Sequence, residues 1–284
     1  MILTKDKKIL IVGLGLMGGS YAQGLTEKGY IVGAIDTKES SIKYGLEKGI
    51  IASGYTEVNE QYVSEFDIII SCLYPKVFID WINKYQSFIK KGAVLTDVTG
   101  VKTWVINEVS KIIRKDIEFI CTHPMAGREV YGVENSNKDI FKGANYIITP
   151  TPFSRVNSLE IVKSIGEILE FKNIVILDHD EHDEMVGFLS QLTHCIAVSL
   201  MACKESTKLV QYTGDSFRDL TRIAKINENM WSELFLLNKD ELLSQIELFQ
   251  NQLEHLRKSI EEEDVDKMKE MMRLSTFRRS FFDK

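Results

Sequence analysis

Three glycines near the start of the chain constrain its fold more than any other feature. Gly13, Gly15 and Gly18 form a G-x-G-x-x-G pattern between an apolar run at 8–12 and a helical segment at 16–28. In such a turn the first glycine permits a tight bend and the second lets the backbone approach a pyrophosphate. The third allows the helix to pack closely on the strand. The pattern therefore predicts a strand-turn-helix unit that binds a dinucleotide.

Asp36 indicates which dinucleotide. It ends a second predicted strand at 30–35, about 20 residues beyond the loop, where an acid accepts hydrogen bonds from a ribose 2′-hydroxyl and repels a 2′-phosphate. The sequence favours NAD over NADP, a preference that Lys38 close by weakens. The alternative role for Asp36 is to cap a helix. We expect the phosphates at the helix N-terminus, beside Leu16 and Met17.

Strand and helix signals alternate through the first part of the chain and then stop. Apolar runs typical of buried strands recur as far as 174–177, which predicts a parallel, doubly wound α/β sheet. Beyond about residue 180, apolar residues recur at helical spacing, and no proline follows Pro152. We expect an α/β domain over 1–177 and an all-helical domain over 178–284.

The segment 238–266 is charged and amphipathic. It either packs on its own domain or meets a partner helix, and the sequence leaves both open. Its apolar face carries Leu242, Leu243, Ile246, Phe249 and Leu253.

Composition excludes several classes of protein. The net charge of −6 argues against a nucleic-acid-binding protein. No apolar run approaches the ~20 residues that span a bilayer, and the N-terminus lacks the pattern of a signal peptide. Four scattered cysteines fit reduced thiols. We expect a cytoplasmic protein that binds a small molecule, without a membrane partner. We expect no metal site, because the acids around His179 and His182 suit a helix start.

A histidine is expected at the same edge of the sheet as the glycine loop. His123 directly follows an apolar run at 117–122, and Pro124 and Gly127 shape the loop after it. Ligands of open α/β sheets bind at the carboxyl ends of the strands. The sequence therefore places a titratable imidazole beside the dinucleotide.

Two pairs of polar residues in the helical part have a spacing of four, which puts each pair on one helix face. Ser190 and His194 form the first pair, and Arg218 and Arg222 form the second. A hydrogen-bonded core histidine and surface ion pairs are the ordinary explanations. The alternative is a substrate pocket in which guanidinium groups bind a carboxylate.

With these motifs in place, the chain resembles the prephenate dehydrogenase family, which includes arogenate-using relatives. The resemblance extends over nearly the whole chain. The family's fold is a Rossmann domain followed by a helical dimerisation domain, so the resemblance also implies a homodimer. The motifs, in the family's order, are the glycine loop at 13–19, then 97–102, 123–129, 190–194, and 217–224 followed by Trp231.

The resemblance implies oxidative decarboxylation of prephenate to 4-hydroxyphenylpyruvate in tyrosine biosynthesis, with NAD as the hydride acceptor. It implies that His123 accepts the hydroxyl proton and that Arg222 binds a substrate carboxylate. It further implies that His194 and Ser190 line the pocket and that Arg218 helps to admit or hold the anion.

The chain departs from the family's pattern beside His123. Gly100 replaces a serine whose hydroxyl lies near the reacting group in the family, and Thr99 offers a hydroxyl one residue earlier, as a second catalytic candidate. Gln191 and Thr193 replace a histidine and a proline, which predicts a changed helix start. Arogenate dehydrogenase and a non-catalytic, NAD-binding metabolite sensor therefore remain alternatives. A hydroxyacid dehydrogenase is disfavoured, because the lysine motif of those enzymes has no match.

Overall fold

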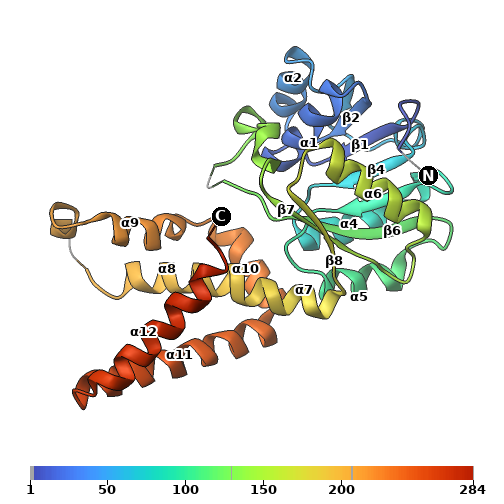
Figure 1. Cartoon of the computed structure of the whole chain (residues 1–284). Helices are drawn as coiled ribbons and strands as arrows, with labels where there is room; N and C mark the ends of the chain where they lie inside the picture. Colours follow the sequence, from blue (N-terminus) through green and yellow to red (C-terminus); the bar gives the residue numbers. More distant parts are fainter. Residues whose placement is uncertain (1–2, 129, 206, 284) are drawn as a thin grey trace.

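The computed structural model describes residues 3–128, 130–205 and 207–283, so Glu129 of the histidine loop lies outside the described residues. Figure 1 shows a sheet domain with helices on both faces and a helical domain that extends away from it. The helix α7 (His179–Val186) lies at the junction between them. The expected α/β domain followed by an all-helical domain is confirmed.

The described residues form a sheet of eight strands in the order β3-β2-β1-β4-β5-β6-β7-β8. The chain order reverses between β1 and β4, so the carboxyl ends of these strands mark the place where such sheets bind ligands. The strands are β1 (Lys8–Val12), β2 (Ile31–Ile35), β3 (Ser53–Tyr55), β4 (Ile68–Ser71), β5 (Val94–Asp97), β6 (Glu118–Pro124), β7 (Asn145–Thr149) and β8 (Asn173–Ile176).

One edge of the sheet departs from the expected parallel order. β7 runs antiparallel to β6, and β8 runs parallel to β7. The connection from β6 to β7 contains two short 3₁₀ turns, η2 (Val133–Asn135) and η3 (Lys138–Phe141), in place of a crossover helix. The chain therefore turns back at the edge where β6 ends, and β7 must run in the opposite direction.

Both faces of the sheet are buried, because the side chains of β1 alternate between two apolar cores. Ile9 and Ile11 belong to one core, and Leu10 and Val12 belong to the other. The helices of this domain are α1 (Leu16–Glu27), α2 (Glu39–Glu47), α3 (Glu60–Val63), α4 (Pro75–Tyr85), η1 (Gln86–Phe88), α5 (Thr103–Ile112) and α6 (Val156–Ile168).

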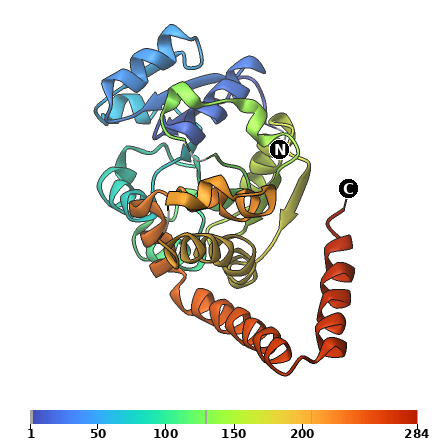
Figure 2. The same ribbon diagram turned by 90° about the vertical axis from the view of Figure 1, so that its left-hand side faces the viewer.

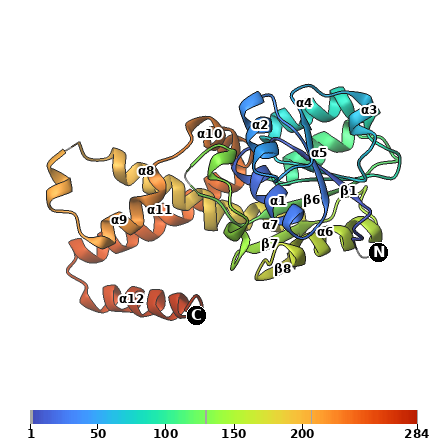
Figure 3. The same cartoon turned by 90° about the horizontal axis from the view of Figure 1, so that it is seen from above.

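The second domain is helical in all its described residues. Figures 2 and 3 show that its last helix leaves the preceding one at a sharp turn and stands apart from the rest of the domain. After α7 come η4 (Gly187–Leu192), α8 (Thr193–Ala202), η5 (Thr207–Gln211), α9 (Asp215–Thr221), η6 (Arg222–Ala224), α10 (Glu228–Leu237), α11 (Lys239–Glu261) and α12 (Val265–Ser280).

Within the described residues 130–205, no separate helix begins near Gln191 and Thr193. α7, η4 and α8 form one continuous helix, His179–Ala202, and η4 is a π-helical segment within it. By length and composition this helix could cross a membrane, with a mean hydropathy of 1.5, although the sequence pattern indicated no such segment. Within the chain 28% of the apolar window of this helix is buried, and His182 and Asp183 near the N-terminus of the helix are buried as well.

Candidate functional site

The glycine loop has the geometry of a phosphate-binding turn. Gly13 has a φ of +93°, which favours glycine, and a Cβ on Gly18 would collide with the carbonyl oxygen of Gly13. A Cβ on Gly15 would meet nothing within 4 Å, so the backbone is open to a ligand there. α1 begins directly afterwards at Leu16 and Met17, without a side-chain cap. The N-terminus of this helix is therefore available to an anion.

Asp36 lies beside this loop at the carboxyl end of β2. Its carboxylate accepts hydrogen bonds from the backbone N–H groups of Leu14, at 2.7 Å, and Lys38, at 2.8 Å. Lys38 is itself the N-cap residue of α2. Asp36 therefore does not cap that helix, and its position suits contact with a ribose.

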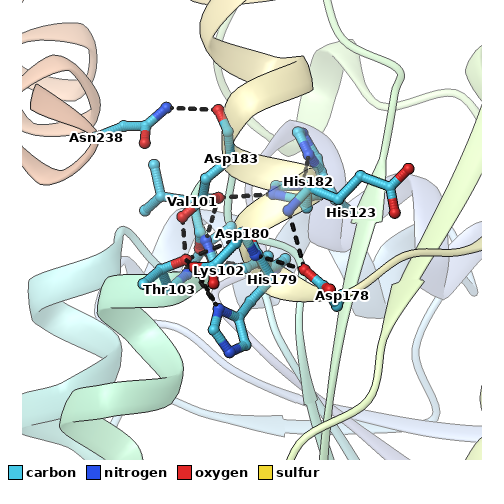
Figure 4. A network of polar contacts seen from close by, with 12 residues as sticks. Val101, Lys102, Thr103, His123, Asp178, His179, Asp180, His182, Asp183 and Asn238 are labelled. Carbon is cyan, nitrogen blue, oxygen red and sulfur yellow. Dashed lines mark hydrogen bonds and ion pairs between the residues drawn. The ribbon is translucent and has the colours of Figure 1, made fainter. Parts of the chain in front are cut away.

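His123 lies near the carboxyl end of β6 and is linked to α7 through His182, which in turn contacts Asp183 (Figure 4). Its Nδ1 is 2.9 Å from Nε2 of His182, and Nδ1 of His182 is 2.7 Å from Oδ1 of Asp183. His182 and Asp183 are buried, whereas His123 is half-buried. The two domains thus supply one hydrogen-bonded chain of three side chains that ends at the imidazole of His123.

Asp183 is fixed from several sides. Its carboxylate accepts hydrogen bonds from the backbone N–H groups of Lys102 and Thr103, each at 2.8 Å, where α5 begins. Its backbone carbonyl accepts a hydrogen bond of 2.9 Å from Nδ2 of Asn238. A carboxylate at a helix N-terminus satisfies backbone donors that lack helical partners and interacts favourably with the helix dipole. Asp183 therefore holds the helical domain onto the sheet domain.

Burial sets the protonation of these three side chains. Removal from water, with the nearby charges of His182 and Lys102, holds the pKa of His123 well below its ordinary value. Burial likewise lowers the pKa of His182, although its hydrogen bond to Asp183 opposes the shift. Burial raises the pKa of Asp183, but hydrogen bonds from His182 and the start of α5 outweigh this, so the net shift is downward. Near neutral pH the site therefore holds two neutral imidazoles and one carboxylate.

A buried ion pair lies beside these histidines. Nζ of Lys102 donates hydrogen bonds to Oδ2 of Asp97 at 2.6 Å, the carbonyl of Thr122 at 2.8 Å and Oγ1 of Thr99 at 3.2 Å. The single O–H of Thr99 lies within hydrogen-bond distance of two acceptors, the Asp97 carboxylate and the carbonyl of Val101. The Thr99 hydroxyl is thus hydrogen-bonded to the ion pair and not to the imidazole of His123. That placement argues against the catalytic role expected for Thr99.

The residue beside His123 is Gly100. A Cβ at this position would lie 3.8 Å from Cε1 of His123 and 3.7 Å from both terminal methyl carbons of Leu234. These are ordinary van der Waals distances. The position occupied by serine in the family's pattern therefore faces the imidazole, and in this chain it carries no side chain.

The structure brings Ser190, His194 and Trp231 together. The carbonyl of Ser190, in the π-helical segment, accepts a hydrogen bond from Nδ1 of His194 at 2.8 Å. The His194 ring stacks on Trp231 with the ring centroids 3.7 Å apart. π-Helical segments are frequent at functional sites. This cluster forms a half-buried polar and aromatic surface.

Gln191 connects helices of the second domain. It is buried, its Oε1 accepts a hydrogen bond of 2.8 Å from Asn238, and its Nε2 donates one of 3.2 Å to the carbonyl of Leu234. It thereby ties the long helix to α10 and α11. This explains how the chain accommodates glutamine at a position where the family's pattern has histidine.

The two arginines lie on the exposed side of the helical domain. Arg222 begins η6, and Arg218 forms an ion pair of 3.1 Å with Asp215. Arg218 also donates to the carbonyl of Thr213 at 3.4 Å. A surface ion pair is therefore present at Arg218, but among the described residues its partner is Asp215 and not Asp219 or Glu228, the partners considered from the sequence.

Two site residues were missed from the sequence. Asp183 belongs to a run of acids that suggested only a helix start, and Asn238 stood at the edge of the amphipathic tail segment. The adjacency of Asp183 to His182 was the available signal. Within the described residues, no group of three or more His, Cys, Asp and Glu side chains is placed to hold a metal ion.

The sheet with its glycine loop, the imidazole at the sheet edge and the helical second domain define a two-domain, dinucleotide-binding oxidoreductase. Comparison with known proteins identifies the family. Residues 21–175 match the family model of the prephenate dehydrogenase nucleotide-binding domain, and residues 178–274 match that of the prephenate dehydrogenase dimerization domain. The chain therefore belongs to the prephenate dehydrogenase family, as the resemblance indicated.

Individual relatives agree with this assignment. The chain is 30% identical to a prephenate dehydrogenase of Lactococcus lactis over 270 residues, which is 91% of this chain and 72% of that protein. It is 25% identical to a cyclohexadienyl dehydrogenase of Zymomonas mobilis, over 93% of this chain and 92% of that protein. The crystal structure of prephenate dehydrogenase from A. aeolicus, in complex with hydroxyphenyl propionate and NAD+, superposes with a TM-score of 0.88. It has 30% identity and covers 98% of both chains.

Proposed function

We propose that this protein is an NAD-dependent prephenate dehydrogenase that forms 4-hydroxyphenylpyruvate by oxidative decarboxylation. The observation that carries the proposal is the position of the His123 imidazole, hydrogen-bonded to His182, at the sheet edge that also holds the glycine loop. Burial lowers the pKa of this imidazole, which favours its neutral form. The A. aeolicus relative, whose structure contains NAD+ and a hydroxyphenyl compound, supports the same assignment. Gly13, Gly15 and Gly18 would hold the pyrophosphate, and Asp36 the ribose.

Each residue then has a defined task. As hydride leaves the ring carbon that bears the 4-hydroxyl, His123 accepts the hydroxyl proton, which leaves a ring ketone. The ring carboxylate then departs as carbon dioxide, the electrons of the broken bond make the ring aromatic, and His123 returns the proton to the ring oxygen. Bound NAD supplies the hydride acceptor. Arg222 binds a substrate carboxylate, because a guanidinium group matches that anion. Ser190 and His194 line the pocket, and Arg218 attracts the anion from the exposed side.

A comparison of two substrates and two cofactors tests the activity. We expect prephenate with NAD to give the highest kcat/KM. Faster turnover of arogenate would favour the arogenate dehydrogenase alternative, and turnover with NADP alone would contradict the role of Asp36. Protein that binds NAD but oxidises neither substrate would favour the metabolite sensor.

The substitution His123→Asn tests the base. Because it removes the proton acceptor, kcat should fall by ~10²-fold or more, the range of general base catalysis, with little change in substrate affinity. Near-normal turnover would contradict the assignment.

We further propose a soluble, cytoplasmic homodimer with domains at 1–177 and 178–284. The gap between β8, which ends at Ile176, and α7, which begins at His179, supports this division. The family model matched by residues 178–274 is that of a dimerization domain, which supports the dimer.

A further inference from the structure

We propose that His182 and Asp183 are positioning residues that fix which nitrogen of His123 accepts the substrate proton. They do so across the domain boundary, so that docking of the helical domain sets the base. This inference rests on the proposed function, in which His123 is the base. It assigns a task to two buried residues that do not contact the substrate in that proposal.

The hydrogen bonds determine the tautomers. The Asp183 carboxylate can only accept, so Nδ1 of His182, 2.7 Å away, carries a proton. A neutral imidazole has a single N–H, so Nε2 of His182 is an acceptor. Nδ1 of His123, 2.9 Å from that nitrogen, must then be the donor. Nε2 of His123 is left with its lone pair, ready to accept the proton of the substrate hydroxyl.

The same chain stabilises the cation that forms. When Nε2 of His123 takes the proton, the positive imidazolium still donates its Nδ1–H to His182. The charge of Asp183 lies one hydrogen bond further on, in a buried region where electrostatic interactions are weakly screened. The other charges that face the histidines are Lys102 and Asp97, which neutralise each other at 2.6 Å. The charge of Asp183 therefore remains available to the histidines.

The hydrogen-bonded chain from His123 to Asp183 forms only when the two domains are docked. His123 belongs to the sheet domain, whereas His182 and Asp183 belong to α7. The carboxylate of Asp183 is held by the first backbone N–H groups of α5, at Lys102 and Thr103, as Figure 4 shows. Movement of α7 away from α5 would remove the hydrogen-bond acceptor of His123. The imidazole could then adopt either tautomer. The orientation of the base is therefore coupled to the domain interface.

Substitutions at His182 separate the tautomer effect from a structural effect. In His182→Leu, Asp183 keeps its two backbone donors but His123 loses its acceptor, so we expect kcat to fall by about 10²-fold with KM nearly unchanged. His182→Gln places an amide oxygen where it can accept from Nδ1 of His123. It should therefore restore kcat to within about tenfold of the unchanged enzyme. His255→Leu, on the exposed tail helix, is the matched control and should leave both constants unchanged.

Nitrogen-15 NMR of the histidine side chains provides a readout independent of activity. In the free, unsubstituted protein at neutral pH, His123 should be the Nδ1–H tautomer, with its signals assigned by their loss in His123→Asn. In His182→Leu it should become a mixture of both tautomers. An Nε2–H tautomer of His123 in the unsubstituted protein would overturn the inference, even if His182→Leu fails to fold. So would full kcat in a folded His182→Leu variant.

The two proposals can fail separately. Full activity of His123→Asn would show that His123 is not the base of the proposed function. The tautomer spectrum would still show whether Nδ1 of His123 donates to His182. Loss of activity in His123→Asn with no effect of His182→Leu would keep the base and exclude the positioning role.

Discussion

At position 100 this chain has no side chain, although a Cβ there would lie 3.8 Å from Cε1 of its proposed base, His123. Gly100 is absent from the glycines with positive φ, and a Cβ there would fit between His123 and Leu234 at ordinary distances. Thr99 does not replace the missing hydroxyl, because Asp97 and Lys102 engage its own. The imidazole of His123 therefore has no free neighbouring hydroxyl from this segment.

Restoring a hydroxyl at this position should increase the rate. Gly100→Ser would place a donor beside His123, and we expect kcat to rise by about tenfold. This is less than the usual value of a preorganised donor, because nothing holds the new rotamer. Gly100→Ala adds the Cβ without the hydroxyl and should leave kcat unchanged. An equal response of both variants in steady-state assays would show that packing, and not the hydroxyl, controls the rate.

The lowered pKa values of His123 and His182 predict the response to acid. His123 must be neutral to accept a proton, so kcat/KM should stay level as the pH falls through about 6.5, the ordinary pKa of histidine, and decline only below it. Unfolded histidines take up protons near pH 6.5 while the folded ones do not, so folding stability should also decrease below that pH. A decline in kcat/KM centred at or above pH 6.5 would contradict the shift.

The sequence predicted part of this site. His123 could be placed because a buried apolar run leads directly into it, near the carboxyl end of β6, and Asp36 could be placed because it follows β2 directly. Asp183 could not, because its neighbours are acids that suit any helix start, and its burial depends on the docking of α7 against α5. The side-chain direction of Thr99 likewise depends on the position of Lys102, which local pattern does not reveal.

At the scale of elements, the contact of α1 with β1 separates the tasks of two glycines. A Cβ on Gly18 would meet the Gly13 carbonyl and, at 2.9 Å, Cγ2 of Ile11. Gly18→Ala should therefore push α1 off the sheet and lower the melting temperature. Gly15→Ala meets no neighbour and should melt normally, yet weaken NAD binding by obstructing the pyrophosphate. Calorimetric melting and NAD titration of both variants check this, and equal melting temperatures would contradict it.

The sequence predicted the boundaries of elements that have continuous apolar runs. It did not predict elements whose formation depends on tertiary structure. The run at 8–12 and the segment 145–149 correspond to β1 and β7. β3 was missed because Ser53-Gly54-Tyr55 has no apolar run, and it forms by pairing with β2. The reversal of β7 follows from the path of the chain between 125 and 144, which periodicity does not encode.

At the scale of the whole molecule, α10 joins the two domains at the site. Leu234 and Leu237 pack on the core that lies under α4 and α5, and Glu233 accepts a hydrogen bond of 2.8 Å from the backbone of Lys76. Leu234 is also a neighbour of Gly100. The helical domain therefore completes the surroundings of His123 with both α7 and α10.

The apolar side chains of the last two helices, α11 and α12, are mostly uncovered within one chain. Leu243, Phe249 and Leu253 of α11 are exposed, so the alternative of packing only on its own domain is disfavoured. On α12, Phe277 is 62% and Phe281 72% exposed. Soluble proteins seldom leave apolar patches of this kind open to water, and the matching family model is that of a dimerization domain. We expect a second copy of the chain to cover this face.

Charge on this face should separate the dimer. Phe277→Glu would bury a carboxylate without a partner at the interface, so we expect sedimentation velocity to show a monomer where the unsubstituted protein is a dimer. Val156→Glu makes the same kind of change at an exposed position of α6 in the sheet domain, and should remain dimeric. A dimeric Phe277→Glu variant would show that the dimer interface lies elsewhere. A monomeric unsubstituted protein would show that no such interface forms. Measuring both at several protein concentrations distinguishes a weakened dimer from an unchanged one, because dissociation follows mass action.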